Sequence, residues 1–287
     1  MRNEGIVELY APRRTLIGRD GITKIPHFLQ RLSSKCVLVV TDKGLIKVGT
    51  AGKVTAVLNN ANIQYVVYDG VEPNPTTRIV YDALHFYQEH QCDAIIAIGG
   101  GSPIDVAKAV SILSANGGKI QDYNGYNKSK KRGTPIIAVN TTAGTGSECT
   151  PFTIISDANT GMKWPLIGYE MMPEMAIVDA DNMMKLPPRA TQASGYDVLT
   201  HAVEAYVSTF ATEYTNGMCR DATKMVFDYL PRAYYSAFRD AKPDPVAREK
   251  MANASALAGI AFANAFLGIN HSLSHKLGGW FHIPHGT

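Results

Sequence analysis

Hydrophobic and polar positions in the first half of the chain alternate between two kinds of segment. Short apolar runs rich in Val, Ile and Ala are typical of buried strands and lie at 36–41, 64–69, 93–101 and 135–142. Amphipathic stretches between them predict helices at 49–61, 76–90 and 102–118. Continuous apolar strands separated by helices indicate a parallel sheet that is covered on both faces.

The pattern changes near Pro187, and from there it has a mostly helical period. The long helical stretches lie at 190–209, 217–238 and 245–269. Because Pro187 and Pro188 together mark a break, we predict an α/β domain over residues 1–186 and an all-α domain over residues 187–287.

A glycine-rich turn joins the apolar run at 93–101 to the helix that follows it. We expect Ser102 to cap this helix, Pro103 to take its first position and Asp105 to complete the cap. Free N–H groups at the helix start suit a pyrophosphate, which predicts a nucleotide site at Gly99, Gly100, Gly101 and Ser102. Ile104 occupies the final glycine position of the Rossmann fingerprint, so a purely structural turn is the alternative.

Other strand ends add polar groups to the same predicted edge of the sheet. Asp42 can accept from a ribose 2′-hydroxyl and repel a 2′-phosphate, or it can begin the helix that follows. Asn74 can reach the cofactor or cap the next helix. The loop 140–148 supplies hydroxyls, or forms an ordinary turn, and its candidate residues are Thr141, Thr142 and Thr145.

Histidines and one aspartate form a candidate metal site. Asp197 and His201 are four residues apart, as are His271 and His275, so each pair lies on one helix face. His285 follows on a late loop. One carboxylate with imidazoles and no thiolate suits Fe²⁺, Zn²⁺ or a similar ion. We expect Asp197, His201, His271 and His285 as ligands, with His275 free to move protons or serving only in packing.

A nucleotide site beside such an ion predicts hydride transfer between NAD(H) and an alcohol or aldehyde, with His275 exchanging the proton. A net charge of +3 without a dominant basic stripe argues against nucleic-acid binding. Isolated cysteines, no secretory leader and no membrane-length apolar run favour a cytoplasmic protein.

The segments that carry this chemistry resemble the iron-containing (group III) alcohol dehydrogenases. The resemblance rests on GGGSPID at 99–105, TTAGTGSE at 141–148, DVLTHAVEAY at 197–206 and HSLSHKLGGWFHIPHG at 271–286. Two stretches, GMKWPLIGYEMMPEMAIVDA and AGIAFANAFLGINHSLSHKLG, look especially like the alcohol dehydrogenase half of bifunctional aldehyde-alcohol dehydrogenases. VEPNPT and VTDKGL are also similar to the propanediol and methanol dehydrogenase branch.

The resemblance implies a dehydroquinate synthase-like architecture, in which an α/β domain is followed by an all-α domain and a cleft lies between them. It implies the same four metal ligands and the same glycine loop, places His275 by the substrate, and makes Asp42 the residue that favours NAD over NADP. It also implies that Lys163 lies near the cofactor. The implied activity is on short primary alcohols or their aldehydes, and in a fermenting cell we expect aldehyde reduction.

Members of the resembling family continue beyond the PHG motif. We therefore expect a chain that is incomplete at its C-terminus and exposes apolar surface on its helical domain. Two other functions remain open: a glycerol or other polyol dehydrogenase on the same fold, and a truncated, inactive nucleotide-binding or assembly subunit. An edge strand from the first residues could pair two chains, so a homodimer or higher homo-oligomer is expected.

Overall fold

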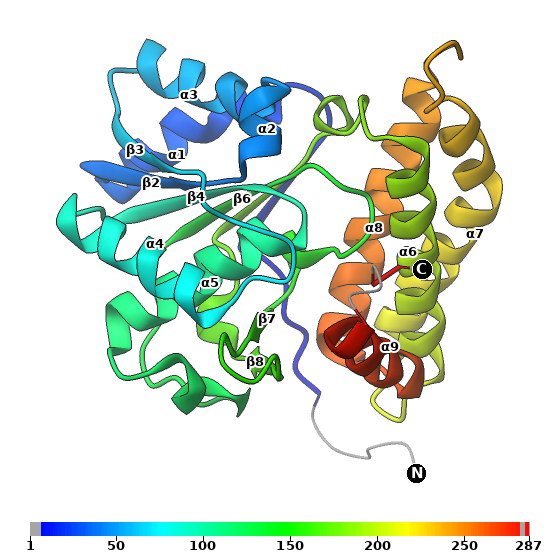
Figure 1. Ribbon diagram of the computed structural model, residues 1–287. Coiled ribbons are helices and arrows are strands. Elements are labelled where there is room, and N and C mark those ends of the chain that lie inside the picture. Colours follow the sequence, from blue (N-terminus) through cyan, green and yellow to red (C-terminus); the bar gives the residue numbers. More distant parts are fainter. Residues whose placement is uncertain (1–6, 282–284, 287) are drawn as a thin grey trace.

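A computed structural model describes residues 7–281, 285 and 286. Its centre is a six-stranded, fully parallel sheet in the order β1-β9-β6-β4-β2-β3 (Figure 1). The strands are Arg14–Ile17 (β1), Cys36–Val40 (β2), Gln64–Tyr68 (β3), Ala94–Gly99 (β4), Ile136–Asn140 (β6) and Met175–Val178 (β9). The prediction of a parallel sheet is therefore confirmed.

Helices cover both faces of this sheet, since alternate side chains of each strand point to opposite sides. On one face, Val37 and Val39 of β2 pack with α1 (Ile25–Leu32) and α3 (Thr50–Asn60). On the other face, Leu38 and Val40 pack with α4 (Thr77–Glu89) and α5 (Gly101–Asn116). Short elements complete this part: α2 (Lys43–Lys47), η1 (Gly21–Lys24), η2 (Ile120–Tyr123), η3 (Ser147–Cys149), η4 (Tyr169–Met171) and η5 (Ala180–Asn182).

A second, three-stranded sheet in the order β5-β8-β7 was not predicted. Its strands are Gly125–Tyr126 (β5), Phe152–Ser156 (β7) and Lys163–Ile167 (β8). Strand β7 packs against α5, and β8 contacts α9 of the helical part. The small sheet therefore forms a wall beside the start of α5.

The remaining described residues form a helical bundle beside the sheet (Figure 1). Its helices are α6 (Pro188–Val207), α7 (Glu213–Tyr235), α8 (Pro245–Ala265) and α9 (Ile269–Phe281). Helices α6, α7 and α8 pack on one another through small side chains, including the buried alanines of α8. Phe266, with φ of 61°, ends α8 and turns the chain into α9.

The helical part exposes apolar side chains, as expected, and Val207, Tyr214, Phe227, Tyr235 and Ile269 are among them. No single described helix is long and apolar enough to cross a membrane, while α8 and α9 pass that test only as a pair bent by 106°. Strand β1 lies at the edge of the large sheet, and residues 1–6, part of the segment expected to pair two chains, lie outside the described residues.

The predicted start of α5 was wrong in detail. The N-cap is Gly100, which has extended backbone and makes no side-chain cap, so α5 begins before Ser102 and Pro103 lies inside its first turn. The carboxylate of Asp105 faces the small sheet and loop, where it accepts from Ser147 Oγ at 3.2 Å and from Ile154 N at 3.2 Å. The turn still presents the start of a helix, without the predicted capping box.

Candidate metal and nucleotide site

Helix α6 carries Asp197, His201 and Glu204 on one face, because steps of four and three residues return to the same side of a helix. The turn after α8 brings α9 across this face. The His271 ring of α9 stacks on the His201 ring, with centroids 4.4 Å apart and an interplanar angle of 21°. Phe262 of α8 also stacks on His201 at 4.4 Å. The two histidines are thus held by packing as well as by polar contacts.

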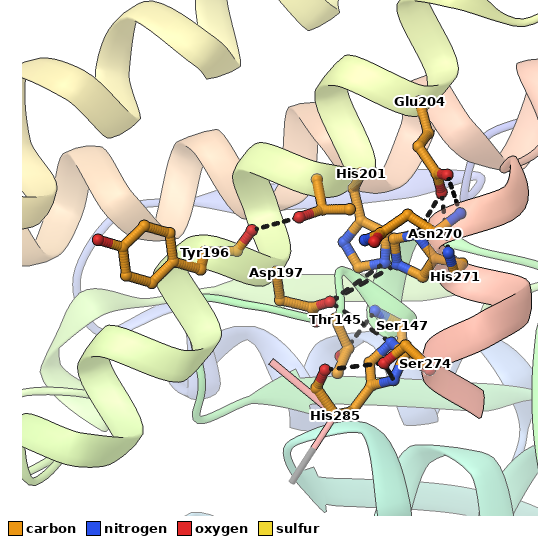
Figure 2. Close-up of polar contacts among 11 residues, drawn as sticks. Thr145, Ser147, Tyr196, Asp197, His201, Glu204, Asn270, His271, Ser274 and His285 are labelled. Atoms are coloured by element: carbon orange, nitrogen blue, oxygen red, sulfur yellow. Dashed lines mark hydrogen bonds and ion pairs between the residues drawn. The ribbon is translucent and has the colours of Figure 1, made fainter. Parts of the chain in front are cut away.

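The four predicted metal ligands lie together (Figure 2). The Oδ1 atom of Asp197 is 3.8 Å from His201 Nε2, 3.6 Å from His271 Nε2 and 3.5 Å from His285 Nε2. One ligand atom from each residue lies within 4.8 Å of all the others. Tetrahedral coordination with bonds of about 2.1 Å separates ligand atoms by about 3.4 Å, so the cluster is close to the size that one ion needs.

Hydrogen bonds fix which ring nitrogen of His271 and His285 faces the cluster. Nδ1 of His271 lies 2.6 Å from Glu204 Oε2, and a carboxylate can only accept, so Nδ1 carries the proton. Nδ1 of His285 lies 3.1 Å from Ser274 Oγ, whose hydroxyl donates to the His285 carbonyl. In both rings, Nε2 is left with a lone pair directed at Asp197. Among the described residues, His271 Nε2 is buried without a hydrogen-bond partner, as expected of an atom that binds a cation.

The protonation states also suit a cation. Burial acts to raise the pKa of Asp197, but the neighbouring histidines hold it at about 2. Burial lowers the pKa of His201 to about 4 and also lowers the pKa of His285. Although burial acts to lower it, the pKa of His271 is raised by the carboxylates of Asp197 and Glu204. The cluster therefore offers one carboxylate together with the neutral imidazoles of His201 and His285, and a cation bound at Nε2 of His271 would replace the proton that the two carboxylates favour there.

His275 lies one helical turn beyond His271 but outside the ligand cluster. Its ring is 6.4 Å from His271 and 4.9 Å from His285, measured between centroids. Burial, together with the nearby His285 and Lys163, lowers the pKa of His275 to about 3, so the ring is neutral at physiological pH. It lines a cavity of about 410 Å³ that also contains the metal cluster, with apolar walls at Phe152, Phe266 and Leu267.

A second cavity of about 440 Å³ extends from the glycine turn toward α2. It is lined by Asp42 at one end and by Gly100, Gly101 and Ser102 at the other. Gly101 and Ser102 also line the cavity that holds the metal cluster, so the two spaces meet at the first turn of α5. An extended ligand can therefore reach from Asp42 past the start of α5 to the histidines.

Asp42 both caps the helix that follows it and faces a cavity. Its Oδ1 accepts from Leu45 N at 2.9 Å and caps α2, and the residue also lines the second cavity. Asn74 does not cap α4, whose N-cap is Thr76. Instead, its Oδ1 accepts from Lys163 Nζ at 2.7 Å, so both side chains meet at the wall of the metal-containing cavity.

The remaining predicted cofactor residues divide into two groups. Thr145 lines the metal-containing cavity and packs over Gly101. Gly99, Thr141 and Thr142 lie beside the glycine turn and are not among the residues that line the two cavities. The Thr142 side chain lies 3.0 Å from a Cβ built on Gly100, and Thr141 N donates to the Gly99 carbonyl at 3.0 Å.

Sequence reasoning missed two groups of residues. Lys108 is fully buried, and its Nζ donates to the carbonyls of Ser147 and Phe152, each at 2.7 Å, which ties loop 140–148 to α5. Glu204 and Ser274, the partners of His271 and His285, were also missed. The position of Glu204, seven residues after Asp197 and three after His201, was an available signal, because it predicts the same helix face.

Comparison with known proteins gives a consistent result. Residues 12–180 match the family model described as iron-containing alcohol dehydrogenase, and residues 191–287 match its C-terminal model. Alcohol dehydrogenase 4 of Schizosaccharomyces pombe is 44% identical over 278 residues, which cover 97% of this chain and 65% of that protein. The bifunctional aldehyde-alcohol dehydrogenase of Escherichia coli is 43% identical over 263 residues, which are 88% of this chain and 29% of that protein. The crystal structure of a 1,3-propanediol oxidoreductase superposes with a TM-score of 0.94 at 38% identity, covering 98% of this chain and 72% of that one.

Proposed function

Because the chain belongs to the iron-containing alcohol dehydrogenase family, we propose that it transfers a hydride between NAD(H) and short primary alcohols or aldehydes. The chain spans 65% of the length of the first relative, so the activity is a proposal. The observation that carries the proposal is the meeting of the two cavities at Gly101 and Ser102, with the metal cluster in one of them.

Asp197, His201, His271 and His285 are proposed to hold a divalent ion, Fe²⁺ in keeping with the family and Zn²⁺ as an alternative. When bound, the ion supplies Lewis-acid stabilisation of the substrate oxygen. The protein itself supplies the fixed geometry of the ligands and the lone pairs at Nε2 of His271 and His285, which the contacts with Glu204 and Ser274 set.

The cofactor is proposed to lie along the two connected cavities. Asp42 would accept from the adenosine ribose and exclude a 2′-phosphate, and the first turn of α5 would bind the pyrophosphate. Thr145, Asn74 and Lys163 would contact the nicotinamide half from the wall of the other cavity. Gly99, Thr141 and Thr142 are proposed to contact the cofactor at the glycine turn, since the Thr142 side chain lies 3.0 Å from a Cβ built on Gly100.

His275 is proposed as the group that moves a proton at the substrate. Its ring lines the cavity that contains the metal cluster and lies 4.9 Å from the His285 ring between centroids, where it can relay a proton between a substrate hydroxyl and solvent. We favour short primary alcohols because Phe152, Phe266 and Leu267 give apolar walls to the cavity of about 410 Å³ that contains the metal cluster.

Three broader properties are proposed for the chain: its domain division, its location and its assembly. The division into residues 1–186 and 187–287 follows the change from sheet to helices, since α6 begins at Pro188. A cytoplasmic location is favoured by the four cysteines, which form no C-x-x-C pair in the sequence. A homo-oligomer formed through the edge of the large sheet remains a prediction.

The test is NADH consumption with propionaldehyde, on protein loaded anaerobically with Fe²⁺ and separately with Zn²⁺. We expect metal-dependent turnover that His271→Ala abolishes and His85→Ala, which removes an exposed histidine on α4, leaves unchanged. Turnover that survives both chelation and His271→Ala would contradict the metal-dependent reaction. Binding of NADH without any turnover would instead favour the inactive nucleotide-binding subunit.

A further inference from the structure

Glu204 lies outside the predicted ligand set, yet it contacts the metal cluster through His271 (Figure 2). We propose that Glu204 is a positioning residue that sets the tautomer and orientation of His271 and fixes the first turn of α9 to α6. The inference rests on the proposed metal site. In it, the Glu204 carboxylate holds His271 in position beside the other three candidate ligands.

The contacts of Glu204 are directed at two parts of α9. Its Oε2 accepts from the ring nitrogen Nδ1 of His271 at 2.6 Å and from the His271 backbone N–H at 3.3 Å. Its Oε1 accepts from the backbone N–H of Asn270 at 2.7 Å. Backbone N–H groups in the first turn of a helix lack intrahelical partners, so Glu204 also satisfies the start of α9. One side chain thereby fixes both the ring and the backbone of His271.

All three of these partners are donors, which explains why the residue is a carboxylate. A carboxylate accepts through both oxygens, whereas the amide group of a glutamine would direct its own N–H bonds at one of the donors. Glu204 is buried, so water does not compete for these three hydrogen bonds.

The surrounding backbone is shaped to admit this carboxylate. A Cβ built on Gly268 would lie 2.9 Å from Glu204 Oε1, so the residue that precedes α9 leaves room for the side chain. On its other side, the His271 ring is stacked on His201. With Nδ1 bound to Glu204, rotation of the ring away from Asp197 would break the 2.6 Å hydrogen bond, and Nε2 stays directed at the cluster.

Partners of this kind typically change metal affinity by about 10–100-fold when they are removed. The test uses the full chain, freed of metal by chelation, and measures Zn²⁺ affinity by competition with a coloured chelator. Visible absorption of bound Co²⁺ is recorded in parallel, because its bands report the geometry of the ligands. We expect Glu204→Ala to weaken Zn²⁺ binding by about 10–100-fold and to change the Co²⁺ bands.

Two further variants separate positioning from stability. Glu204→Gln keeps the size of the side chain and one acceptor oxygen, so we expect its Zn²⁺ affinity to fall by about tenfold, the lower end of that range. If Glu204→Ala does not fold, Glu204→Gln serves as the test. Ser272→Ala removes a different contact in the first turn of α9, the 3.1 Å hydrogen bond to the Gly268 carbonyl, without touching the His271 ring. It should leave the Zn²⁺ affinity and the Co²⁺ bands unchanged.

A purely structural role would lower the unfolding temperature of Glu204→Gln and leave ion binding by the folded protein as in the wild type; that result overturns the proposal. If the wild-type chain and the Glu204 variants bind Zn²⁺ equally while His271→Ala does not, the metal site stands and only the role of Glu204 is rejected. A wild-type chain that binds no ion would reject both.

Discussion

Gly259, in the middle of α8, is a position where adding one methyl group should act on the cofactor loop. A Cβ built there would lie 2.8 Å from the carbonyl oxygen of Gly146 and 3.1 Å from its Cα. In the opposite direction, a Cβ on Gly146, which has φ of 58°, would lie 2.7 Å from Gly259 Cα. Both contacts are with backbone, so no side-chain rotation relieves them, and Gly259→Ala must displace loop 140–148.

The expected change in stability follows from two opposing effects. Alanine is favoured over glycine inside a helix by about 1 kcal/mol. Overpacking of a filled interior costs about 1–3 kcal/mol. The net result for Gly259→Ala is a loss of about 0–2 kcal/mol in the free energy of unfolding. Gly217, inside α7, has no described atom within 4 Å of an added Cβ, so Gly217→Ala should gain up to about 1 kcal/mol.

The assay is urea unfolding of both variants, together with NADH binding measured by fluorescence. Thr145 lines the cavity and Ser147 holds Lys108, so displacement of their loop should also weaken NADH binding by Gly259→Ala and not by Gly217→Ala. A Gly259→Ala protein that matches Gly217→Ala in both stability and NADH affinity would refute the close contact between α8 and the loop.

Further predictions concern three charged residues. Asp42→Gly should relax the preference for NADH over NADPH and cost only a few tenths of a kcal/mol, since glycine is tolerated at an N-cap; an unchanged cofactor ratio in steady-state kinetics would reject its role. Burial raises the pKa of Glu148 from 4.5 to about 7, so the folded state binds an extra proton between these values and wild-type stability falls as the pH rises through them. Glu148→Gln does not titrate and should gain stability relative to wild type across that range, and urea unfolding that shows a constant difference would contradict the shift. Lys108→Met should lose about 3–5 kcal/mol by the same assay, because two buried carbonyls and Asp105 lose their partner; a loss below about 1 kcal/mol would argue against this network.

Four strands of the large sheet, β2, β3, β4 and β6, were predictable from their apolar runs, whereas β1 and β9 have four residues each and were not predicted. Residues such as Ile95, Ile96 and Ile98 in β4 must all be apolar, which makes a continuous pattern. The small sheet gave no such signal. Its strand β8 reads Lys163, Trp164, Pro165 and has mixed burial, and β5 contains only Gly125 and Tyr126. These strands form through tertiary contacts with α5 and α9, which local pattern does not encode.

Two of the four candidate metal ligands, Asp197 and His201, were predictable as a pair because four-residue spacing places them on one face of α6 independently of the rest of the fold. His271 and His285 lie on α9 and on the loop after it, so their approach to α6 depends on tertiary structure. The error at Ser102 has a local cause: Gly100 adopts extended backbone, so the helix starts at Gly101 and the serine loses the cap position. Asp105 could not be assigned from sequence, since its partners Ser147 and Ile154 lie more than 40 positions away, at separations of 42 and 49 residues.

Loop 140–148 lies between the glycine turn and the candidate metal site, and it contacts α5, α6 and α8. Gly144 packs against Ser194 of α6, the helix that holds Asp197 and His201, with a built Cβ 2.7 Å from the Ser194 Cβ. Gly146 packs against α8, and Ser147 is bound by Lys108 of α5. The loop therefore touches the helix that starts at the nucleotide cavity and the helix that carries the metal ligands. Any displacement of one of these helices must move the loop or break its contacts, so the separation between a bound cofactor and the metal cluster depends on the fit of this one segment.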